Sequence, residues 1–536
     1  MTKPKSERVE LAMDELEAIV DRARSALSEE EHHQLKAVLE TLGRLTQELE
    51  KKRTSIYRLR ELLFGARTEK TAAVLNNKKR SSSARSPTGR KGKRKKTKGH
   101  GRHGAADYKG AKRVAVFHEA LKSGDPCPQT DCTGKVYLLK EPGMIVRIKG
   151  MPPLPATVYE LEKLRCNPCG TVFTAKAPQG IGEQKYDETA VSLIALLKYG
   201  AGFPFNRLEK LQGNFGIPLP ATTQWDLVDA AAKQLTPLFE WYIDEAAQGE
   251  VLHNDDTPMK ILELMKENED RENSERTGMF TSGVISQCGE HLVALFFTGR
   301  NHAGENLTRI LEKRADQLAA PIQMCDALSR NQPEELETIL SNCLSHGRRK
   351  FVEQVNSFPE ECRYILNTVA EVYKYDTITN EQEMSPKARL QFHQTNSEPL
   401  MEKLHQWFED QFEQKLIEPN SGLGEAISYM LTHWQALTLF LHQPGAPLDN
   451  NICERALKKA ILHRKNALFY KTQNGAQVGD LFMSLIHTAE LAEINAFDYL
   501  CALQRHTEDV GVNPEQWMPW NYQQALHIAT DVVDHV

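Results

Sequence analysis

Three acidic residues stand where a divalent-metal site could form. Asp255 follows a short apolar run at 251–253 and Asp326 follows another at 322–325, so each lies at the end of a predicted strand. Glu454 lies further along, in helical sequence. Carboxylates from separate elements can hold two hard cations around one phosphate, as the cutting and joining of phosphodiesters requires. Because the chain has 72 acidic residues, these three alone do not single out a site.

The sequence around these acids predicts a ribonuclease-H-like core. Apolar, β-prone runs and one amphipathic repeat predict strands at 251–253, 279–286, 291–297 and 322–325 and a helix at 301–314. Three strands, a helix and a strand that ends in an acid are the order expected of that fold. The following sequence is mostly helical, and the part from 333 to 445 is long for a connector.

Four of the ten cysteines form two close pairs. Four residues separate Cys127 from Cys132, and two separate Cys166 from Cys169, with Gly170 behind them. Two such pairs, each on a hairpin, are how a zinc ribbon supplies four thiolates. The pattern predicts a structural Zn²⁺ in a small β-rich module; the alternatives are a site that has lost its metal and redox-active thiols. The other six cysteines are scattered, which is typical of a reducing cytoplasm.

Positive charge is concentrated in one short segment. Residues 78–113 carry fifteen Lys and Arg and one acid, whereas the rest carries 52 Lys and Arg against 71 Asp and Glu. Such a cationic arm gains affinity for a polyanion by releasing condensed counterions, so nucleic-acid contact is favoured over a solvated linker. Its low apolar content predicts disorder without a partner. The candidate DNA-binding residues in the arm are Arg90, Lys91, Lys93, Arg94, Lys95 and Lys96.

Helical segments flank the arm and the cysteine module. From Leu35 to Leu63, apolar residues recur at alternating steps of three and four, with Lys52 as an interruption. This predicts a coiled coil and a homo-oligomer, with an amphipathic helix packed on its own chain as the alternative. Further on, a helix at 206–215 and a second from Ala221 have the outline of a helix-turn-helix, which many helical hairpins share.

Five short motifs occur in order along the chain, at residues 63–70, 253–258, 343–351, 447–456 and 463–469. The second is His-Asn-Asp-Asp-Thr-Pro, the third is Cys-Leu-Ser-His-Gly-Arg-Arg-Lys-Phe, and the fourth contains Asp-Asn-Asn-Ile-Cys-Glu-Arg-Ala. In content and order they resemble the motifs of the transposases of the insertion sequence 66 family. The resemblance covers about residues 55–505.

This resemblance implies a DDE-type transposase in which Asp255, Asp326 and Glu454 are catalytic. In that reading the three acids hold two Mg²⁺ or Mn²⁺ ions per active site. The resemblance also implies an all-helical insertion between the second and third acids. Two tryptophans of the family pattern are replaced here, by Leu344 and Ala467.

Several neighbouring residues leave the composition of the site open. Asp256 stands where the family has Glu, and Asp449 could be the third ligand instead of Glu454, although Asp is also common in turns. His253 and His346 could contact the site. Cys343 with His346 could suggest a second metal, but an isolated Cys-x-x-His is more typical of packing and a hydrogen bond.

Basic residues close to the motifs are further candidates for DNA contact. Arg348 and Arg349 could bind a phosphate or lie on a solvated face. Four basic residues follow Glu454 and favour DNA contact, although the first of them could pair with that acid along the helix. These four are Lys458, Lys459, Arg464 and Lys465.

These features predict a multidomain α protein with an α/β core, in seven segments. They are an N-terminal helical coiled coil (1–75), a disordered basic linker (76–112), a zinc-binding module (113–182), a helix-turn-helix-like DNA-binding segment (183–245), the first part of the ribonuclease-H-like core (246–332), an all-helical insertion (333–445), and the C-terminal helices and tail (446–536).

The expected activity is metal-dependent cleavage of transposon ends followed by strand transfer into target DNA. The alternatives are a catalytically silent or accessory DNA-binding protein and an RNA-guided system on the same core. The expected partners are double-stranded DNA, a second copy of the chain and accessory proteins encoded by the same element. No apolar run reaches the ~20 residues of a membrane span, and the N-terminus has no apolar signal, so we expect a bacterial, nucleoid-associated cytoplasmic protein.

Overall fold

The computed structural model divides the chain into two compact units, one formed by residues 83–157 and one by residues 1–82 with 158–536. The structure describes residues 19–22, 28–29, 32, 35–36, 71–76, 113–116, 118–129, 132–139, 150–165, 172–180, 182, 184–269, 276–333 and 336–533. Most of the predicted coiled coil and nearly all of the predicted basic linker, including Arg90 to Lys96, therefore lie outside the described residues. Among the described helices, none is both long and apolar enough to cross a membrane.

The larger unit contains a five-stranded mixed sheet with the strand order β5-β4-β3-β6-β7. Its strands are β3 (Val251–Pro258), β4 (Phe280–Cys288), β5 (His291–Gly299), β6 (Ile322–Cys325) and β7 (Ile339–Asn342). β4 is antiparallel to both of its neighbours, β3 and β5, whereas β6 and β7 run parallel to β3. The four predicted strands are confirmed. The fifth, β7, lies beyond residue 332, in sequence that predicts only helix.

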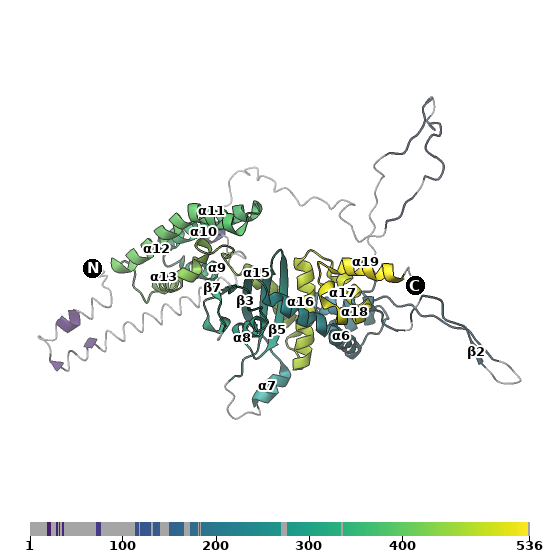
Figure 1. Cartoon of the computed structure of the whole chain (residues 1–536), viewed down its shortest axis with the longest axis horizontal. Coiled ribbons are helices and arrows are strands. Elements are labelled where there is room, and N and C mark those ends of the chain that lie inside the picture. Colours follow the sequence, from purple (N-terminus) through teal and green to yellow (C-terminus); the bar gives the residue numbers. More distant parts are fainter. Residues whose placement is uncertain are drawn as a thin grey trace, which may run out of the picture. The chain divides into compact units, whose positions relative to one another are not determined.

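Helices cover both faces of this sheet (Figure 1). On one face, α8 (Ala303–Leu311) binds β4 through the amide of Asn306 and the hydroxyl of Ser282, and α6 (Ala221–Ala247) packs Phe239 near Phe297 of β5. On the other face, α15 (Asn451–Ala467) lies over Gly283 of β4. Because strand side chains alternate between faces, neighbouring residues of β3 contact different helices.

The edge strand β5 is closed by α16 (Gln473–Leu491), whose side chains bind the outward-facing backbone of the strand. Side chains at four-residue intervals on this helix accept the N–H groups of alternate strand residues: Thr488 from Ala294, Ser484 from Phe296 and Asp480 from Thr298. An open edge strand exposes such groups to pairing with other chains. Here a polar stripe on a buried helix fulfils the role of a neighbouring strand.

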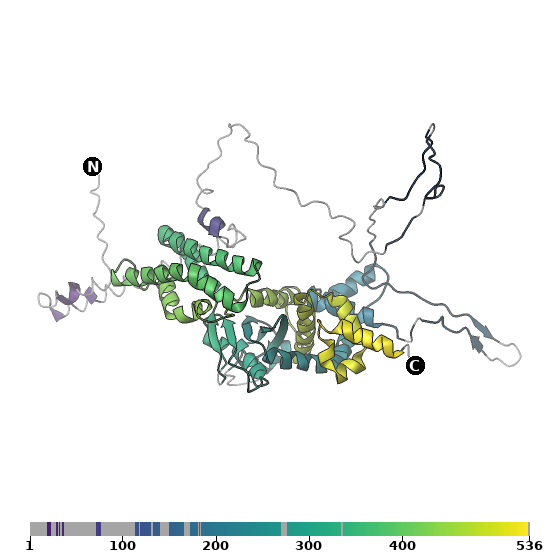
Figure 2. The ribbon, with the colours of Figure 1, turned by 45° about the horizontal axis from the view of Figure 1, so that its top comes forward.

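The all-helical insertion follows β7 and has its own apolar core. It comprises α9 (Leu344–Gln354), α10 (Pro359–Glu381), α11 (Pro386–Asn396), α12 (Glu398–Glu413), α13 (Gly422–Thr432) and the short α14 (Trp434–Leu437). Phe351 and Phe408 stack at the centre of that core, and Val74 and Leu75 of α3 (Thr71–Asn76) pack against it. In both views the insertion lies on one side of the sheet and the C-terminal helices lie on the other (Figures 1 and 2).

The predicted helix-turn-helix segment packs on the same core. It contains α4 (Glu188–Ala195), the π-helical turn Leu196–Gly200, α5 (Phe205–Asn214) and α6, with Gly216 in the left-handed region at φ 73°. The second helix is far longer than predicted, and it buries Leu235, Leu238 and Tyr242 against the sheet and α16. The C-terminal helices are α17 (Ala496–Arg505), α18 (Thr507–Val512) and α19 (Tyr522–Val533).

Candidate active site

Asp255 and Asp326 lie level with each other on neighbouring strands. The parallel register pairs His253 of β3 with Met324 of β6, so two residues further on Asp255 comes opposite Asp326, which directly follows β6. Neighbouring strands are about 5 Å apart. Both acids therefore lie at the same edge of the sheet, as their positions in the sequence predict. Asp326 is oriented by hydrogen bonds to its Oδ1 from the Leu328 N–H and the Asn331 amide.

Glu454 reaches this edge from the first turn of α15, because the helix lies very close to the sheet. Gly283 of β4 permits the approach: a Cβ there would lie 3.1 Å from the Leu457 side chain and 3.5 Å from Cys453 Sγ. The Cys453 thiol donates to the Gly283 carbonyl at 3.3 Å. Residue 283 pairs with Asp255 across the strands, so Glu454 is brought to the face that carries Asp255.

Asn450 fixes the start of α15. Its side chain is fully buried; Oδ1 accepts from His253 Nδ1 at 3.1 Å, and the amide donates to the Asn254 carbonyl at 3.0 Å. Its backbone N–H donates to Cys343 Sγ at 3.2 Å, which ties α15 to the start of α9. Burial lowers the pKa of His253 to about 4, so this histidine is neutral. Sequence reasoning did not assign Asn450 a role, although it lies inside the fourth motif.

The pKa of Asp255 is shifted by burial and by the neighbouring acids. The pKa of the Asp255 carboxyl is raised to about 7, mainly by burial and also by the negative charges of Asp326, Asp256 and Glu454, while a hydrogen bond from the Asp256 N–H lowers it. A carboxyl group perturbed by burial and by like charges is typical of a functional site. A bound cation would relieve that repulsion.

Asp256 points to the opposite face of β3. Its carboxylate is 1% exposed and contacts His302 Nδ1 at 2.8 Å and Arg330 at 3.4 Å. These contacts belong to the face covered by α8, whereas Asp255 faces α15. The structure therefore separates Asp256 from the acid cluster.

Asp449 is engaged in local hydrogen bonds. Its carboxylate accepts from the Asn451 N–H at 3.1 Å and from the Ser345 hydroxyl at 3.3 Å, so it holds the start of α9 against the start of α15. This arrangement favours Glu454 over Asp449 as the third acid.

Two side chains from α9 approach Glu454. His346 Nε2 lies 3.7 Å from Glu454 Oε1, and an Arg349 nitrogen lies 3.9 Å from Oε2. All three side chains are partly exposed, so solvent weakens these pairs. An imidazole and a guanidinium therefore lie beside Glu454.

Comparison with known proteins agrees with this geometry. A family model described as Transposase IS66 family matches residues 184–478, which is more than half of the chain. The chain belongs to the IS66 family of transposases. The matched region runs from α4 into α16 and contains all three acids, so the family assignment and the acid cluster concern the same part of the fold.

The IS66-family chain is also similar to uncharacterized proteins of Sinorhizobium fredii. The protein y4hP is 25% identical over 379 residues, covering 68% of this chain and 67% of the relative. The protein y4jD is 33% identical over 188 residues, covering 34% and 36%, and y4qI is 23% identical over 412 residues, covering 74% and 75%. The names of these relatives describe no activity, so the family assignment rests on the family model.

The basic residues proposed for DNA contact have different surroundings. Arg348 donates to the Thr71 hydroxyl of α3 at 3.3 Å, and Lys459 pairs with Glu490 at 2.6 Å. Arg464 binds the Thr257 hydroxyl at 3.1 Å and the Pro258 carbonyl, so it ties α15 to the end of β3.

Lys458 and Lys465 are exposed and lie seven residues apart on α15, with Arg455 on the same side. This exposed basic stripe begins next to Glu454.

One of the two cysteine pairs lies on a hairpin of the smaller unit. The Cys127 N–H donates to the Gly134 carbonyl at 2.8 Å, and Pro126 forms a bridge with Lys135. A backbone hydrogen bond at Gly134 and a contact with Cys127 lower the pKa of the Cys132 thiol, so the two sulfurs face each other. Both cysteines of this pair therefore lie on one hairpin.

The second pair, Cys166 and Cys169, lies outside the described residues. It belongs to the connection between the antiparallel strands β1 (Lys163–Arg165) and β2 (Val172–Thr174). The four-thiolate zinc site stays a prediction.

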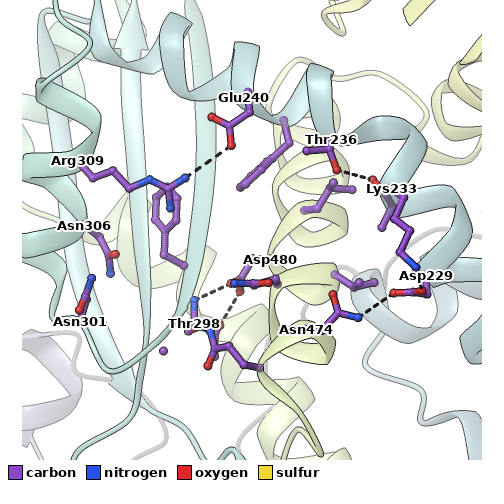
Figure 3. Close-up of a pocket in the computed structure, with 18 of the residues that line it drawn as sticks. Asp229, Lys233, Thr236, Glu240, Thr298, Asn301, Asn306, Arg309, Asn474 and Asp480 are labelled. Atoms are coloured by element: carbon purple, nitrogen blue, oxygen red, sulfur yellow. Dashed lines mark hydrogen bonds and ion pairs between the residues drawn. The ribbon is translucent and has the colours of Figure 1, made fainter. Parts of the chain in front are cut away.

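A cavity of about 620 Å³ lies away from the acid cluster, between α6, α16 and the end of β5 (Figure 3). Two pairs of its charged side chains contact each other: Asp229 lies 2.6 Å from Lys233, and Glu240 lies 3.6 Å from Arg309. None of the three acids lines this cavity.

Proposed function

We propose that this IS66-family protein is an active DNA transposase that cuts the ends of its element and joins them to target DNA. Asp255, Asp326 and Glu454 would hold two Mg²⁺ or Mn²⁺ ions. The observation that carries the proposal is the convergence of these three carboxylates, from two strand ends and one helix, with the pKa of Asp255 raised to about 7 by burial and by its neighbours.

The strand order supports a ribonuclease-H-like catalytic domain. Three antiparallel strands are followed by a helix and a strand parallel to the first, and the acids lie where β3 and β6 run side by side. A sheet holds such carboxylates more rigidly than a loop does, which suits a reaction that depends on precise placement of a phosphate.

The residues fit a pair of divalent cations. All three side chains offer hard oxygen ligands, which Mg²⁺ and Mn²⁺ prefer. Glu454 Oε1 is buried and has no hydrogen-bond partner among the described residues, so it is available to a ligand. When bound, the cations would activate the attacking oxygen and stabilise the leaving oxygen of the phosphodiester.

The chain's own residues would position that phosphodiester. Asp255 and Asp326 are fixed by the sheet, and Glu454 is fixed by Asn450 and by the close contact at Gly283. Arg349 lies beside Glu454 and could bind a non-bridging phosphate oxygen without competing for the cations.

The path proposed for the DNA backbone runs along α15 and past the insertion, and it rests on the distribution of charge. The exposed stripe of Lys458 and Lys465 leads away from Glu454, and the basic arm of residues 78–113 begins two residues after α3 ends. The helix before the arm, α3, packs on the insertion, and its Thr71 hydroxyl accepts from Arg348 of α9, the helix that also carries Arg349. Phosphate contacts of this kind give affinity without sequence preference.

The test is cleavage of labelled DNA carrying the ends of the element, with Mg²⁺ or Mn²⁺ added and then chelated. Asp255→Asn and Glu454→Gln should each abolish nicking while DNA binding persists. Asp256→Asn is the matched control, because this neighbour faces α8, and it should keep metal-dependent nicking.

Three results would count against the proposal. Nicking that survives in Asp255→Asn would remove the acid cluster from the reaction. Tight DNA binding without nicking in any metal would favour a catalytically silent or accessory protein. Nicking that requires added RNA would favour a guided system.

A further inference from the structure

A second set of metal-binding atoms overlaps the acid cluster. Cys343 is the N-cap of α9, His346 lies one turn into that helix, and Glu454 reaches both from α15. One ligand atom from each residue lies within 4.8 Å of the others. The sequence shows only Cys-x-x-His, which by itself is more typical of packing. The fold adds the third ligand from a distant segment.

Two atoms of this cluster lack the partners that buried polar groups need. His346 Nδ1 and Glu454 Oε1 are buried and have no hydrogen bond within the described part of the chain. The 3.7 Å between His346 Nε2 and Glu454 Oε1 is too long for one. Because buried polar atoms are almost always satisfied, such a pair indicates a missing binding partner.

The third ligand, Cys343, is fully buried, and its Sγ accepts the Asn450 N–H at 3.2 Å. Burial raises the pKa of this thiol to about 12, so it would lose its proton only when a cation binds. The backbone around it is fixed, since the next residue, Leu344, donates its N–H to the Leu448 carbonyl at 3.1 Å. Small side-chain rotations would bring the three ligand atoms to the ~3.5 Å separations of a tetrahedral zinc site.

The chemistry of the set selects a different cation from that of the acids. Thiolate and imidazole ligands suit Zn²⁺ and its relatives, whereas Mg²⁺ takes oxygen ligands. We propose that Cys343, His346 and Glu454 form a zinc-type site that shares Glu454 with the catalytic acids, so that Zn²⁺ withdraws this carboxylate and inhibits Mg²⁺-dependent cleavage. The binding part stands by itself, and the inhibition part rests on the proposed function.

Binding is tested with Co²⁺, whose thiolate-to-metal absorption reports a cysteine ligand. The experiment uses a full-length variant in which serine replaces the four cysteines of the predicted zinc module, so that this module contributes no signal. These cysteines are Cys127, Cys132, Cys166 and Cys169. In this background we expect one Co²⁺ per chain with a single-thiolate band. Cys343→Ser should remove the band, and Cys325→Ser, a buried cysteine outside the cluster, should keep it.

His346→Gln provides a second variant that does not disturb the buried core, because this side chain is partly exposed. It should weaken Co²⁺ binding at least ~10-fold, since even residues that only support ligands contribute that much. A thiolate band that survives in Cys343→Ser, or an unchanged affinity in His346→Gln, would overturn the site.

Cleavage then separates this site from the proposed function. With Mg²⁺ present, micromolar Zn²⁺ should inhibit the parent chain and should inhibit Cys343→Ser at least ~10-fold less. Cobalt binding without any cleavage would leave the site standing and refute the proposed function. Cleavage without a thiolate band would refute the site and leave the proposed function standing.

Discussion

The carboxyl group of Asp480 should make the stability of the larger unit fall as the pH rises. It lies in α16 at the edge of the sheet, where it accepts the Thr298 N–H at 2.6 Å and the Thr298 hydroxyl at 2.5 Å (Figure 3). Burial raises the pKa of Asp480 to about 7, even though both hydrogen bonds lower it. The folded chain therefore binds this proton more tightly than the unfolded chain does.

The sign and size follow from linkage. The usual pKa of an aspartate is 3.8, so between about pH 4 and pH 7 the proton is held only by the folded state. Stability contributed by the neutral carboxyl is fully present below pH 4 and is lost as the pH rises through 7. The difference between the folded and unfolded pKa of Asp480 corresponds to about 4 kcal/mol in the free energy of unfolding. About 3 kcal/mol of this contribution is lost between pH 5 and pH 8.

Asp480→Asn removes the titrating group and keeps the shape, because the amide can accept from the Thr298 N–H and donate to its hydroxyl. Stability is measured by urea denaturation at pH 5 and pH 8, followed by circular dichroism. From pH 5 to pH 8, the free energy of unfolding of the variant should rise by about 3 kcal/mol relative to that of the wild type. Ser484→Ala is the control: it removes another contact to the same strand without a titrating group. It should lower stability equally at both pH values.

The reasoning is refuted if Asp480→Asn and the wild type show the same dependence on pH. A variant that is destabilised equally at pH 5 and pH 8 would mean that Asp480 is ionised in the fold and that its hydrogen bonds outweigh its burial.

Three further experiments test the packing and charge around the acids. Lys458→Ala with Lys465→Ala should weaken DNA binding and lower the slope of log affinity against log salt by about 2, measured by fluorescence anisotropy. Gly283→Ala should cost about 1–3 kcal/mol in thermal or urea denaturation, because the new methyl meets Leu457, and Leu457→Ala should restore part of the loss. Asp256→Asn should lower stability by weakening the contacts of this buried carboxylate with His302 and Arg330, yet leave Mn²⁺ binding in titrations unchanged.

The catalytic strands could be predicted from the sequence because each carries a clear local pattern. The run at 322–325 is a short apolar strand followed by an acid, and the structure gives it these bounds. In contrast, β7 has only four residues, two apolar and two polar, and such a segment shows no period that separates a strand from a helix. Its position is set by parallel pairing with β6 and not by its own sequence.

The local sequence pattern could not tell whether Asp255 or Asp256 joins the acid cluster, because that depends on which face of β3 meets α15. The contacts with His302 and Arg330 decide it, and both partners come from distant segments. Likewise the sequence could not distinguish Lys459, paired with Glu490, from the exposed Lys458 beside it. Partner choice for a long charged side chain is a property of tertiary structure.

The central claim is that Asp255, Asp326 and Glu454 together bind the catalytic cations. The most direct test is electron paramagnetic resonance titration of Mn²⁺ into the full-length chain with bound end DNA, comparing the wild type with Asp326→Asn. We expect the variant to lose at least one Mn²⁺ per chain and all nicking while it keeps its affinity for DNA. Unchanged Mn²⁺ binding in Asp326→Asn would contradict the account.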